Sequence, residues 1–384
     1  MRAQLLLLVL ILVGMPARAE FAPSGKLEIR YINVGQGGAT LIIGPDGTRV
    51  LYDFGWVDGH KYIVPYLRDR AGITPEDGLH YTFVSHRDAD HYTGYRGVSE
   101  AGYDVLVANF DPGSSKTGVK MEREWLKPAT ETSAGSVRAV PVGLAIALGD
   151  GAEIRVVAAG GVVVGENGQL RKDQAAAVKN ENDRSIALLV RYGRFSYILD
   201  GDLGAGPETC TDHQTNQIDV QTRVARALIA RQWINSESGI DILHVAHHGS
   251  ESSTSAAYFN LMKPTVALIS VGPNQHSFLH PREDVVDRVL IEGGTIPRAD
   301  CAIAIVEHVL QTDVGKEGNS STGRTSFTGT PVGDIEITTD GKSGYNIITT
   351  GRSIDGTPTL ERMCKTFVFG ETSHECENAP EISE

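Results

Sequence analysis

The chain consists of two halves that repeat one order of elements, and this order restricts the fold more than any other feature of the sequence. Each half opens with strand-like segments and continues with helical and strand-like segments in turn. The opening strands are expected at 27–34, 39–44 and 49–55, and again within 185–202. Strands interleaved with helices predict sheets covered by helices. We therefore expect an α/β fold, a four-layer αββα sandwich.

The remaining elements follow the same alternation. Helices are expected near 61–71, 219–233, 253–262 and 281–292, and strands at 104–110, 241–248 and 265–272. The glycine-rich segment 35–38 lies between the first two strands. Such a turn can cradle phosphate, but here no lysine and hydroxyl residue follow in a P-loop arrangement and no helix opens behind it. A hairpin turn is therefore the better interpretation.

The first 19 residues have the pattern of a secretory signal peptide. Arg2 precedes the apolar run 5–13, and Ala17 and Ala19 offer small residues for cleavage. The run is shorter than the roughly 20 apolar residues that a membrane helix needs. We expect an exported protein, periplasmic or extracellular, with no membrane attachment after cleavage; an uncleaved anchor is the alternative.

The rest of the chain is expected to form one hydrolase-like domain, 20–355, and a tail, 356–384. An oxidising compartment permits disulfides, and a Cys364–Cys376 bond would tether that tail. The net charge of -13 disfavours a stable nucleic-acid partner or anionic lipid. It leaves room for a small-molecule or nucleic-acid-like anionic substrate, because a bound divalent cation dominates its local field. No pattern in the sequence indicates an oligomeric state.

The segment SHRDADH at 85–91 gathers two imidazoles and two carboxylates directly after an apolar strand. Buried carboxylates are costly unless a cation compensates them, and histidine and aspartate are common ligands of divalent ions. A solvated turn with ordinary charged residues is the alternative. Within this segment the candidate ligands are His86, Asp88, Asp90 and His91.

Further candidates stand at the ends of later strand-like segments. Asp202 ends one, the pair His247 and His248 ends another, and His280 begins the segment HPRED with Pro281 in its first turn. A lone histidine of this kind is usually a packed or solvated residue. Several such residues at strand ends nevertheless indicate convergence on one edge of the sheets.

These residues carry a family resemblance. SHRDADHYTG, LDGDL and HVAHHGSESSTS resemble the metallo-β-lactamase superfamily, and in particular its ComEC-like hydrolase domain and the free-standing exported relatives of that domain. VGQGG at 34–38, LYDFG at 51–55, NDRS at 182–185, ISVGPNQHSFLHP at 269–281 and GDIEITTDG at 333–341 extend the resemblance, which covers about 27–350.

The resemblance implies a ligand set. The four candidates of the SHRDADH segment would hold metal, Asp202 would bridge two ions, and one histidine of the 247/248 pair would close the site. We favour His247 as the ligand, with His248 donating to substrate. Asp53 falls where the family carries a carboxylate that orients a metal-bound histidine.

Three departures from the family pattern bear on the metals. Asp88 stands where much of the superfamily has histidine, no histidine occurs between His91 and His213, and Gly38 replaces an acidic residue. Asp111 is a candidate substitute for the missing ligand. We expect one or two divalent ions, zinc in preference, with manganese as the alternative because oxygen ligands favour it.

The expected reaction is hydrolysis of a phosphodiester through a metal-bound hydroxide, which forms near neutral pH because the cation lowers the pKa of water. Asp90 would orient the nucleophile or receive its proton, and His248 or His280 would stabilise charge or protonate the leaving group. His280 could equally be a helix-start residue without a catalytic role. Two alternatives remain: hydrolysis of an ester, lactone or amide, and a noncatalytic metal-binding protein.

Overall fold

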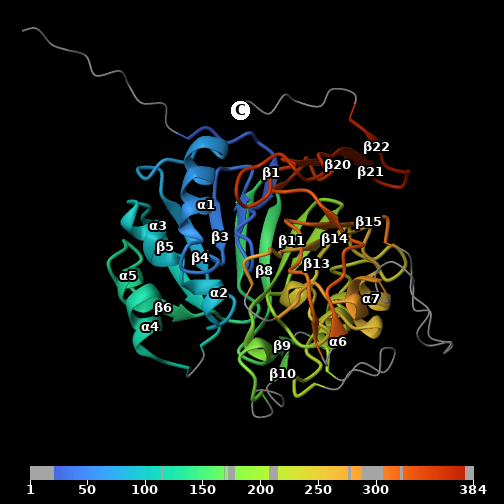
Figure 1. The fold of residues 1–384 in the computed structure, drawn as a ribbon, viewed down its shortest axis with the longest axis horizontal. Helices are drawn as coiled ribbons and strands as arrows, with labels where there is room; N and C mark the ends of the chain where they lie inside the picture. Colours follow the sequence, from blue (N-terminus) through green and yellow to red (C-terminus); the bar gives the residue numbers. More distant parts are fainter. Residues whose placement is uncertain are drawn as a thin grey trace, which may run out of the picture.

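The computed structural model describes residues 21–113, 116–167, 169–171, 178–206, 215–275, 278–287, 306–320 and 323–376. In this part of the chain two large sheets stand face to face, and helices cover their outer surfaces (Figure 1). The expected αββα sandwich is therefore confirmed. The expected signal peptide, 1–19, lies outside the described residues.

The first sheet has the strand order β22-β21-β20-β19-β1-β2-β3-β4-β5-β6. Its strands are β1 Leu27–Tyr31, β2 Thr40–Ile43, β3 Arg49–Tyr52, β4 Leu79–Phe83, β5 Val105–Asp111, β6 Val137–Ala139, β19 Ile335–Thr339, β20 Gly344–Thr349, β21 Cys364–Val368 and β22 His374–Glu375. The second sheet has the order β10-β9-β8-β11-β12-β13-β14-β15-β18, with β7 also paired to β8. Its strands are β7 Ala145–Gly149, β8 Ala152–Ala159, β9 Val162–Val164, β10 Leu170–Arg171, β11 Ala187–Tyr192, β12 Phe195–Leu199, β13 Ile242–His244, β14 Val266–Ile269, β15 His308–Gln311 and β18 Thr330–Pro331. A separate pair is formed by β16 Asn319–Ser320 and β17 Gly323–Arg324.

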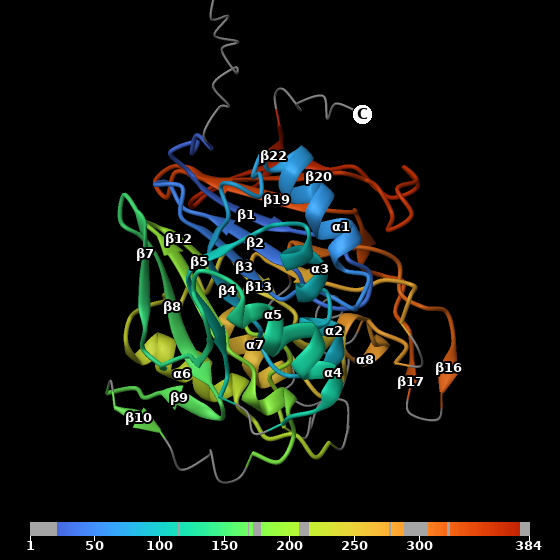
Figure 2. The same ribbon diagram turned by 90° about the vertical axis from the view of Figure 1, so that its left-hand side faces the viewer.

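Helices flank each sheet on the side away from the other sheet, as the two views show (Figures 1 and 2). Those of the first half are α1 His60–Pro65, α2 Ala89–Tyr92, α3 Tyr95–Glu100, α4 Val119–Met121 and α5 Lys127–Thr130, with π-helical turns at Tyr66–Arg70 and Glu122–Leu126. Those of the second half are α6 Gln221–Ala230, α7 Ala256–Met262 and α8 Glu283–Val285, with 3-10 turns at Asn182–Arg184 and Ala246–Gly249.

The four layers enclose three apolar cores. One lies between the sheets and includes Tyr31, Phe83 and Tyr197, and the other two lie under the helices of each half. Strand β1 alternates buried and half-buried residues, whereas every residue of β2, β3, β12 and β14 is buried. Strands covered on both faces need continuous apolar sequence, which explains why the alternation fades in the middle of each sheet.

The strand directions define, in each sheet, the end of the strands where ligand-binding residues are expected. Strands β3 to β6 run parallel, and so do β12 to β15. The carboxyl ends of parallel strands meet at one edge, where open α/β sheets place their ligand sites. The segments that follow β3, β4, β12, β13 and β14 therefore gather there.

Most elements expected from the sequence are present. The segment 35–38 joins β1 and β2, which pair antiparallel, so the hairpin is confirmed. Two expectations were wrong: β13 ends at His244 and not at 248, and His280 precedes α8, which begins at Glu283. Residues 288–292 of the expected last helix lie outside the described part.

Part of the expected tail belongs to the first sheet. Strand β21 pairs with β20, β22 pairs with β21, and the expected disulfide between Cys364 and Cys376 is present.

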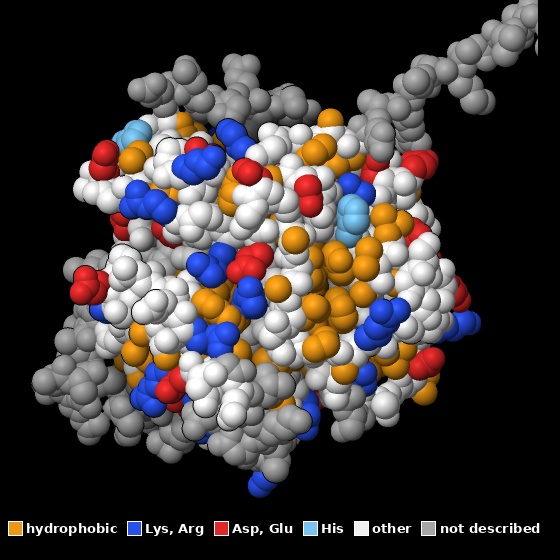
Figure 3. Space-filling model, turned by 180° about the vertical axis from the view of Figure 1, so that it is seen from behind, with side chains coloured by type: hydrophobic (Ala, Val, Ile, Leu, Met, Phe, Trp, Pro, Cys, Tyr) orange, Lys and Arg blue, Asp and Glu red, His pale blue; other side chains and the backbone are white. Residues whose placement is uncertain are grey.

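Among the described residues no helix combines the length and apolarity needed to cross a bilayer. The view from behind shows hydrophobic side chains gathered on that face, with basic and acidic side chains interspersed among them (Figure 3).

Candidate metal centre

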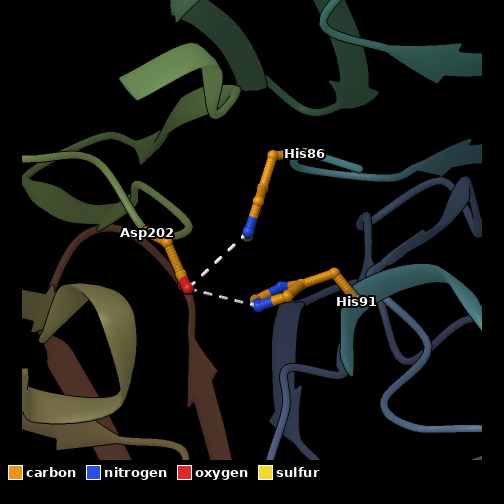
Figure 4. Close-up of side chains that lie close together, drawn as sticks. All are labelled: His86, His91 and Asp202. Carbon is orange, nitrogen blue, oxygen red and sulfur yellow. Dashed lines mark ion pairs between the residues drawn. The ribbon is translucent and has the colours of Figure 1, made fainter. Parts of the chain in front are cut away.

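The site lies where segments that follow the carboxyl ends of strands from the two sheets meet. His86 and Asp88 follow β4, Asp90 and His91 lie on the short helix α2, and Asp202 follows β12. The pair at 247 and 248 lies in the 3-10 turn after β13. Figure 4 shows His86 and His91 pointing towards Asp202 from the opposite half of the molecule. The segments expected to converge are therefore brought together.

One carboxylate oxygen is shared by four imidazoles. Oδ2 of Asp202 lies 3.4 Å from Nε2 of His91 and 3.7 Å from Nε2 of His86. The Nε2 atoms of His247 and His248 each lie 3.8 Å from the same oxygen. This oxygen is central to four ring nitrogens and would be available to any cation that these rings hold, while the bridging role implied by the resemblance stays a prediction.

A second group of donors adjoins the first. Asp90 Oδ2 lies 3.5 Å from Nε2 of His248, and Asp90 Oδ1 lies 3.9 Å from Nε2 of His91. The two imidazole Nε2 atoms are 3.3 Å apart. The structure thus offers two overlapping sets of closely grouped donors, namely His86, His91 and Asp202, and Asp90, His91 and His248.

Hydrogen bonds on the far side of two rings fix which nitrogen carries the proton. Nδ1 of His91 lies 2.7 Å from the Asp53 carboxylate, and Nδ1 of His248 lies 2.8 Å from the carbonyl oxygen of Ser270. Both partners can only accept, so each neutral ring presents a lone pair at Nε2. Two lone pairs facing each other at 3.3 Å require a cation between or beside them.

Without metal, a proton has to supply that charge. Burial opposes it, but the carboxylates of Asp202, Asp53 and Asp90 prevail and hold the pKa of His91 well above its usual range. For Asp202 burial acts in the other direction and raises the pKa, because it disfavours the charged carboxylate. His91 and His248 nevertheless hold the pKa of Asp202 well below its usual value. The charge on the His91 ring and the charge on the Asp202 carboxylate therefore stabilise each other.

The donors fit a divalent cation. Nε2 of His86 and Oδ1 of Asp202 are buried and have no hydrogen-bond partner among the described residues. An unpartnered buried polar atom is costly, and coordination to a cation removes that cost. Imidazole nitrogens with carboxylate oxygens form a ligand set that suits zinc. Asp90, His91 and His248 would hold one ion together with Asp202, whose Oδ2 lies near both rings, while His86 would face a second position beside Asp202.

The other position, near His86, is less complete. Nε2 of His86 lies 3.6 Å from Oδ2 of Asp88, but the other oxygen of that carboxylate accepts a hydrogen bond from Lys116. Asp111, the expected substitute ligand, is held by the guanidinium of Arg87 at 2.5 Å. It is not part of either donor group, and its role as a substitute ligand stays a prediction.

Asp53 and Ser85 form hydrogen bonds with each other and with the candidate ligand His91. The Asp53 carboxylate accepts hydrogen bonds from the backbone N–H and hydroxyl of Ser85, at 2.6 and 2.7 Å, besides its contact with His91. Asp53 has a φ of 62°, in the left-handed region that non-glycine residues rarely adopt. Sequence reasoning missed the role of Ser85, although it stands at the start of SHRDADH.

The glycine turn before β2 packs closely against these residues. A Cβ at Gly37, where φ is 114°, would lie 2.3 Å from the carbonyl oxygen of Asp90. At Gly38 a Cβ would lie 3.2 Å from Oδ2 of Asp53. The departure at Gly38 thus leaves Asp53 without a second carboxylate beside it.

The donor groups favour His248 over His247, whose role as the ligand stays a prediction. Its Nδ1 lies 3.0 Å from the hydroxyl of Ser252, and its ring also contacts the amide of Asn182. His248 is the member of the pair grouped with Asp90 and His91. Both histidines have left-handed backbones, with φ of 54° and 56°, which turns consecutive side chains towards the same cluster. That turn could not be predicted from the strand pattern.

His280 lies beside the cluster and outside the donor groups. Its ring centroid is 5.5 Å from that of His247, and its buried Nδ1 has no hydrogen-bond partner among the described residues. Burial, and then the rings of His247 and His248, hold the pKa of His280 well below its usual range. A pocket of about 440 Å³ opens over the site, lined by Gln36, Asp88, Asp90, Asn180, Asn182, Asp202, His247, His248, Ser250, Glu251, Phe278, His280 and Arg282.

Several known proteins are similar in sequence to this chain, at low identity. No family model matches the chain. It is 27% identical over 267 residues to recombination protein 2 of Haemophilus influenzae, covering 68% of this chain and 26% of that protein. It is 24% identical over 312 residues to competence protein ComA of Neisseria gonorrhoeae, covering 81% and 36%. The chain is distantly homologous to these proteins, and its own strand order makes it a sandwich of two sheets.

The homology covers only part of the relatives. This chain spans between 26% and 36% of the length of the two curated proteins described. Among solved structures, a putative metal-dependent hydrolase from Parabacteroides distasonis is 12% identical, with 68% of this chain and 89% of that one covered and a TM-score of 0.34. In the present chain, the αββα sandwich carries a cluster of histidine and aspartate side chains that could hold a metal ion.

Proposed function

We propose that this protein is an exported, metal-dependent phosphodiesterase. The observation that carries the proposal is the position of Asp202, whose Oδ2 faces four imidazole rings at the floor of an open pocket. A purely structural cluster would be closed over by packing, whereas Asp90 and Asp202 both line space that a substrate can enter.

A divalent cation bound there supplies two effects, a lowered pKa for water and neutralisation of charge on a phosphate. The protein's own residues do the rest. The His91 and His248 rings hold the pKa of Asp90 below its usual value although burial opposes this. Asp90 is therefore ionised at neutral pH and can orient a water molecule by accepting its hydrogen bond.

His280 acts differently from an acid. Because burial lowers its pKa, the ring is neutral at pH 7 and does not carry a proton for release. A neutral imidazole can still donate one hydrogen bond to the oxygen where negative charge develops. His280 therefore stabilises charge in preference to protonating the leaving group.

Two observations favour a phosphodiester over a carbonyl substrate. The pocket wall is mostly polar, with amides of Asn180 and Asn182, the rings of His247 and His280, and Arg282. The relatives are named as recombination and competence proteins. As part of the proposal, we take these names to favour a nucleic-acid-like substrate for this chain. Zinc is the proposed ion, with manganese as the alternative.

The experiment compares substrate classes with and without metal. Protein produced without residues 1–19 is assayed on bis(p-nitrophenyl) phosphate, p-nitrophenyl acetate, a lactone and a β-lactam. We expect zinc- or manganese-dependent turnover of the phosphodiester, abolished by Asp202→Asn and unaffected by Asp58→Asn, an exposed carboxylate paired with Lys61. Turnover confined to carbonyl compounds would replace the proposal by the ester or amide alternative, and no metal-dependent turnover would favour a noncatalytic protein.

Export is proposed from the sequence of residues 1–19 and has its own test. The full chain, expressed in a Gram-negative host, should be recovered outside the cytoplasm with a new N-terminus near Glu20. Retention in the cytoplasm at full length would contradict the export proposal while leaving the proposed chemistry intact.

A further inference from the structure

An exposed aromatic ring stands at the rim of the metal pocket. Phe278 lines the pocket, yet 47% of its surface is accessible to solvent. Its ring lies almost parallel to that of His280, with an angle of 8° and centroids 5.8 Å apart. One face of Phe278 thus adjoins a residue beside the metal donors, while much of the ring remains open.

Described residues beside this ring in the sequence are held by hydrogen bonds and burial. Gln275, which is buried, accepts a hydrogen bond from the backbone N–H of His280 at 2.6 Å and donates one to its carbonyl oxygen at 2.7 Å. Leu279, between the two rings, is buried in a left-handed conformation with φ of 57°. The backbone therefore turns Leu279 inward and Phe278 outward, and strain of this kind is often found at ligand sites.

The wall of the same pocket carries polar side chains beside this ring. The amide residues Asn180 and Asn182 both line the pocket. A flat ring with polar edges would satisfy both features, since its face can stack on Phe278 and its edge can meet amide groups. Nucleobases have this chemistry.

We propose that Phe278 is a stacking platform for the nucleobase next to the scissile phosphodiester, so that the substrate is a nucleotide ester and not a base-free phosphodiester. The inference rests on the proposed function and names its substrate class. Recognition then comes from the pocket that Phe278 lines.

The kinetic test compares two substrates that share a leaving group. One is the p-nitrophenyl ester of thymidine 5′-phosphate and the other is methyl p-nitrophenyl phosphate. We expect Phe278→Leu to raise KM for the thymidine ester by about 5- to 150-fold, the range for the loss of one base–aromatic stack. KM for the methyl ester should be unchanged, and Phe278→Trp should keep the wild-type preference.

Phe327→Leu is the matched control. Phe327 is 57% exposed and is not among the residues that line the metal pocket. Its loss should leave both KM values unchanged. Equal KM values for the two esters in the wild-type protein, or an equal rise for both in Phe278→Leu, would overturn the inference while leaving phosphodiesterase activity established.

A binding measurement separates failure of the inference from failure of the proposed function. Calorimetry with the zinc-loaded protein compares thymidine 5′-monophosphate with 2-deoxyribose 5-phosphate. We expect thymidine monophosphate to bind at least 5-fold more tightly, with Phe278→Leu removing the difference. This result would support the stacking role even if no ester were turned over. Equal affinities, or no binding of either compound, would overturn it whatever the turnover.

Discussion

Asp53 and His91 form a buried contact of 2.7 Å between a carboxylate oxygen and ring Nδ1, and both side chains are almost fully enclosed. This contact decides that Nε2 of His91 faces the pocket as a lone pair. The orientation of a ligand thus depends on a residue 38 positions earlier, at the end of a different strand.

The first prediction concerns this contact. Asp53→Asn keeps the size of the side chain and an acceptor for the N–H of Ser85, but removes the charge that fixes the His91 ring. Loss of such a supporting carboxylate typically weakens metal affinity by about 10- to 100-fold. Zinc affinity from competition with a chromophoric chelator should fall by this amount, whereas Asp58→Asn should leave it unchanged. An unaltered affinity for Asp53→Asn would remove Asp53 from the metal site.

The second prediction distinguishes the two adjacent histidines. His248→Ala removes a ring grouped with Asp90 and His91, so we expect the tightly bound zinc to be lost. His247→Ala leaves that group intact and should retain the tightly bound ion. Metal content after exhaustive dialysis, measured by mass spectrometry, provides the comparison. Retention in His248→Ala with loss in His247→Ala would restore the assignment favoured from the sequence.

The third prediction concerns the number of ions. Lys116 donates to Asp88 and competes with a cation for that carboxylate. We expect the wild-type protein to bind one zinc equivalent tightly and a second weakly. Lys116→Met should raise the affinity for the second equivalent by roughly 10-fold, because it removes a positive charge from a ligand. Titration calorimetry would show this as a second resolved binding step. A wild-type protein that already holds two equally tight ions would contradict the prediction.

The fourth prediction tests a buried acid away from the metal. Burial raises the pKa of Asp334 to about 6, although hydrogen bonds from the backbone N–H of Asn33 and from Thr350 oppose this. A carboxyl with a raised pKa in the folded state holds its proton more tightly there than in the unfolded chain. Its stabilising contribution is present below pH 3.8 and is lost as the pH rises through about 6.

Asp334→Asn should therefore gain stability relative to the wild type as the pH rises from about 4 to about 7, by at most ~3 kcal/mol from the linkage between pKa and stability. Urea unfolding at several pH values, with metal removed from both proteins, measures the difference. The same profile for Asp58→Asn should show no such gain. A difference that shrank as the pH rose would show that the sign is wrong.

The sequence predicted what depends on neighbouring residues. The alternation of strands and helices was sufficient for the sandwich, and SHRDADH places His86, Asp90 and His91 in one short segment. The Cys364–Cys376 bond could be expected because its partners are close along the chain.

Features fixed by distant contacts were not predicted. The choice of His248 over His247 depends on left-handed backbone and on the carbonyl oxygen of Ser270 at the end of β14. The restraint on Asp88 comes from Lys116, 28 residues away. Neither contact leaves a periodic pattern in the sequence, since each arises only when two separate turns meet.

The central claim is that Asp90, His91, Asp202 and His248 hold a divalent cation, and anomalous diffraction tests it most directly. Crystals of the zinc-loaded protein, measured on both sides of the zinc absorption edge, should show a peak about 2.0–2.2 Å from the Nε2 atoms of His91 and His248 and from carboxylate oxygens of Asp90 and Asp202. A zinc-saturated crystal with no anomalous peak among these four side chains would contradict the account.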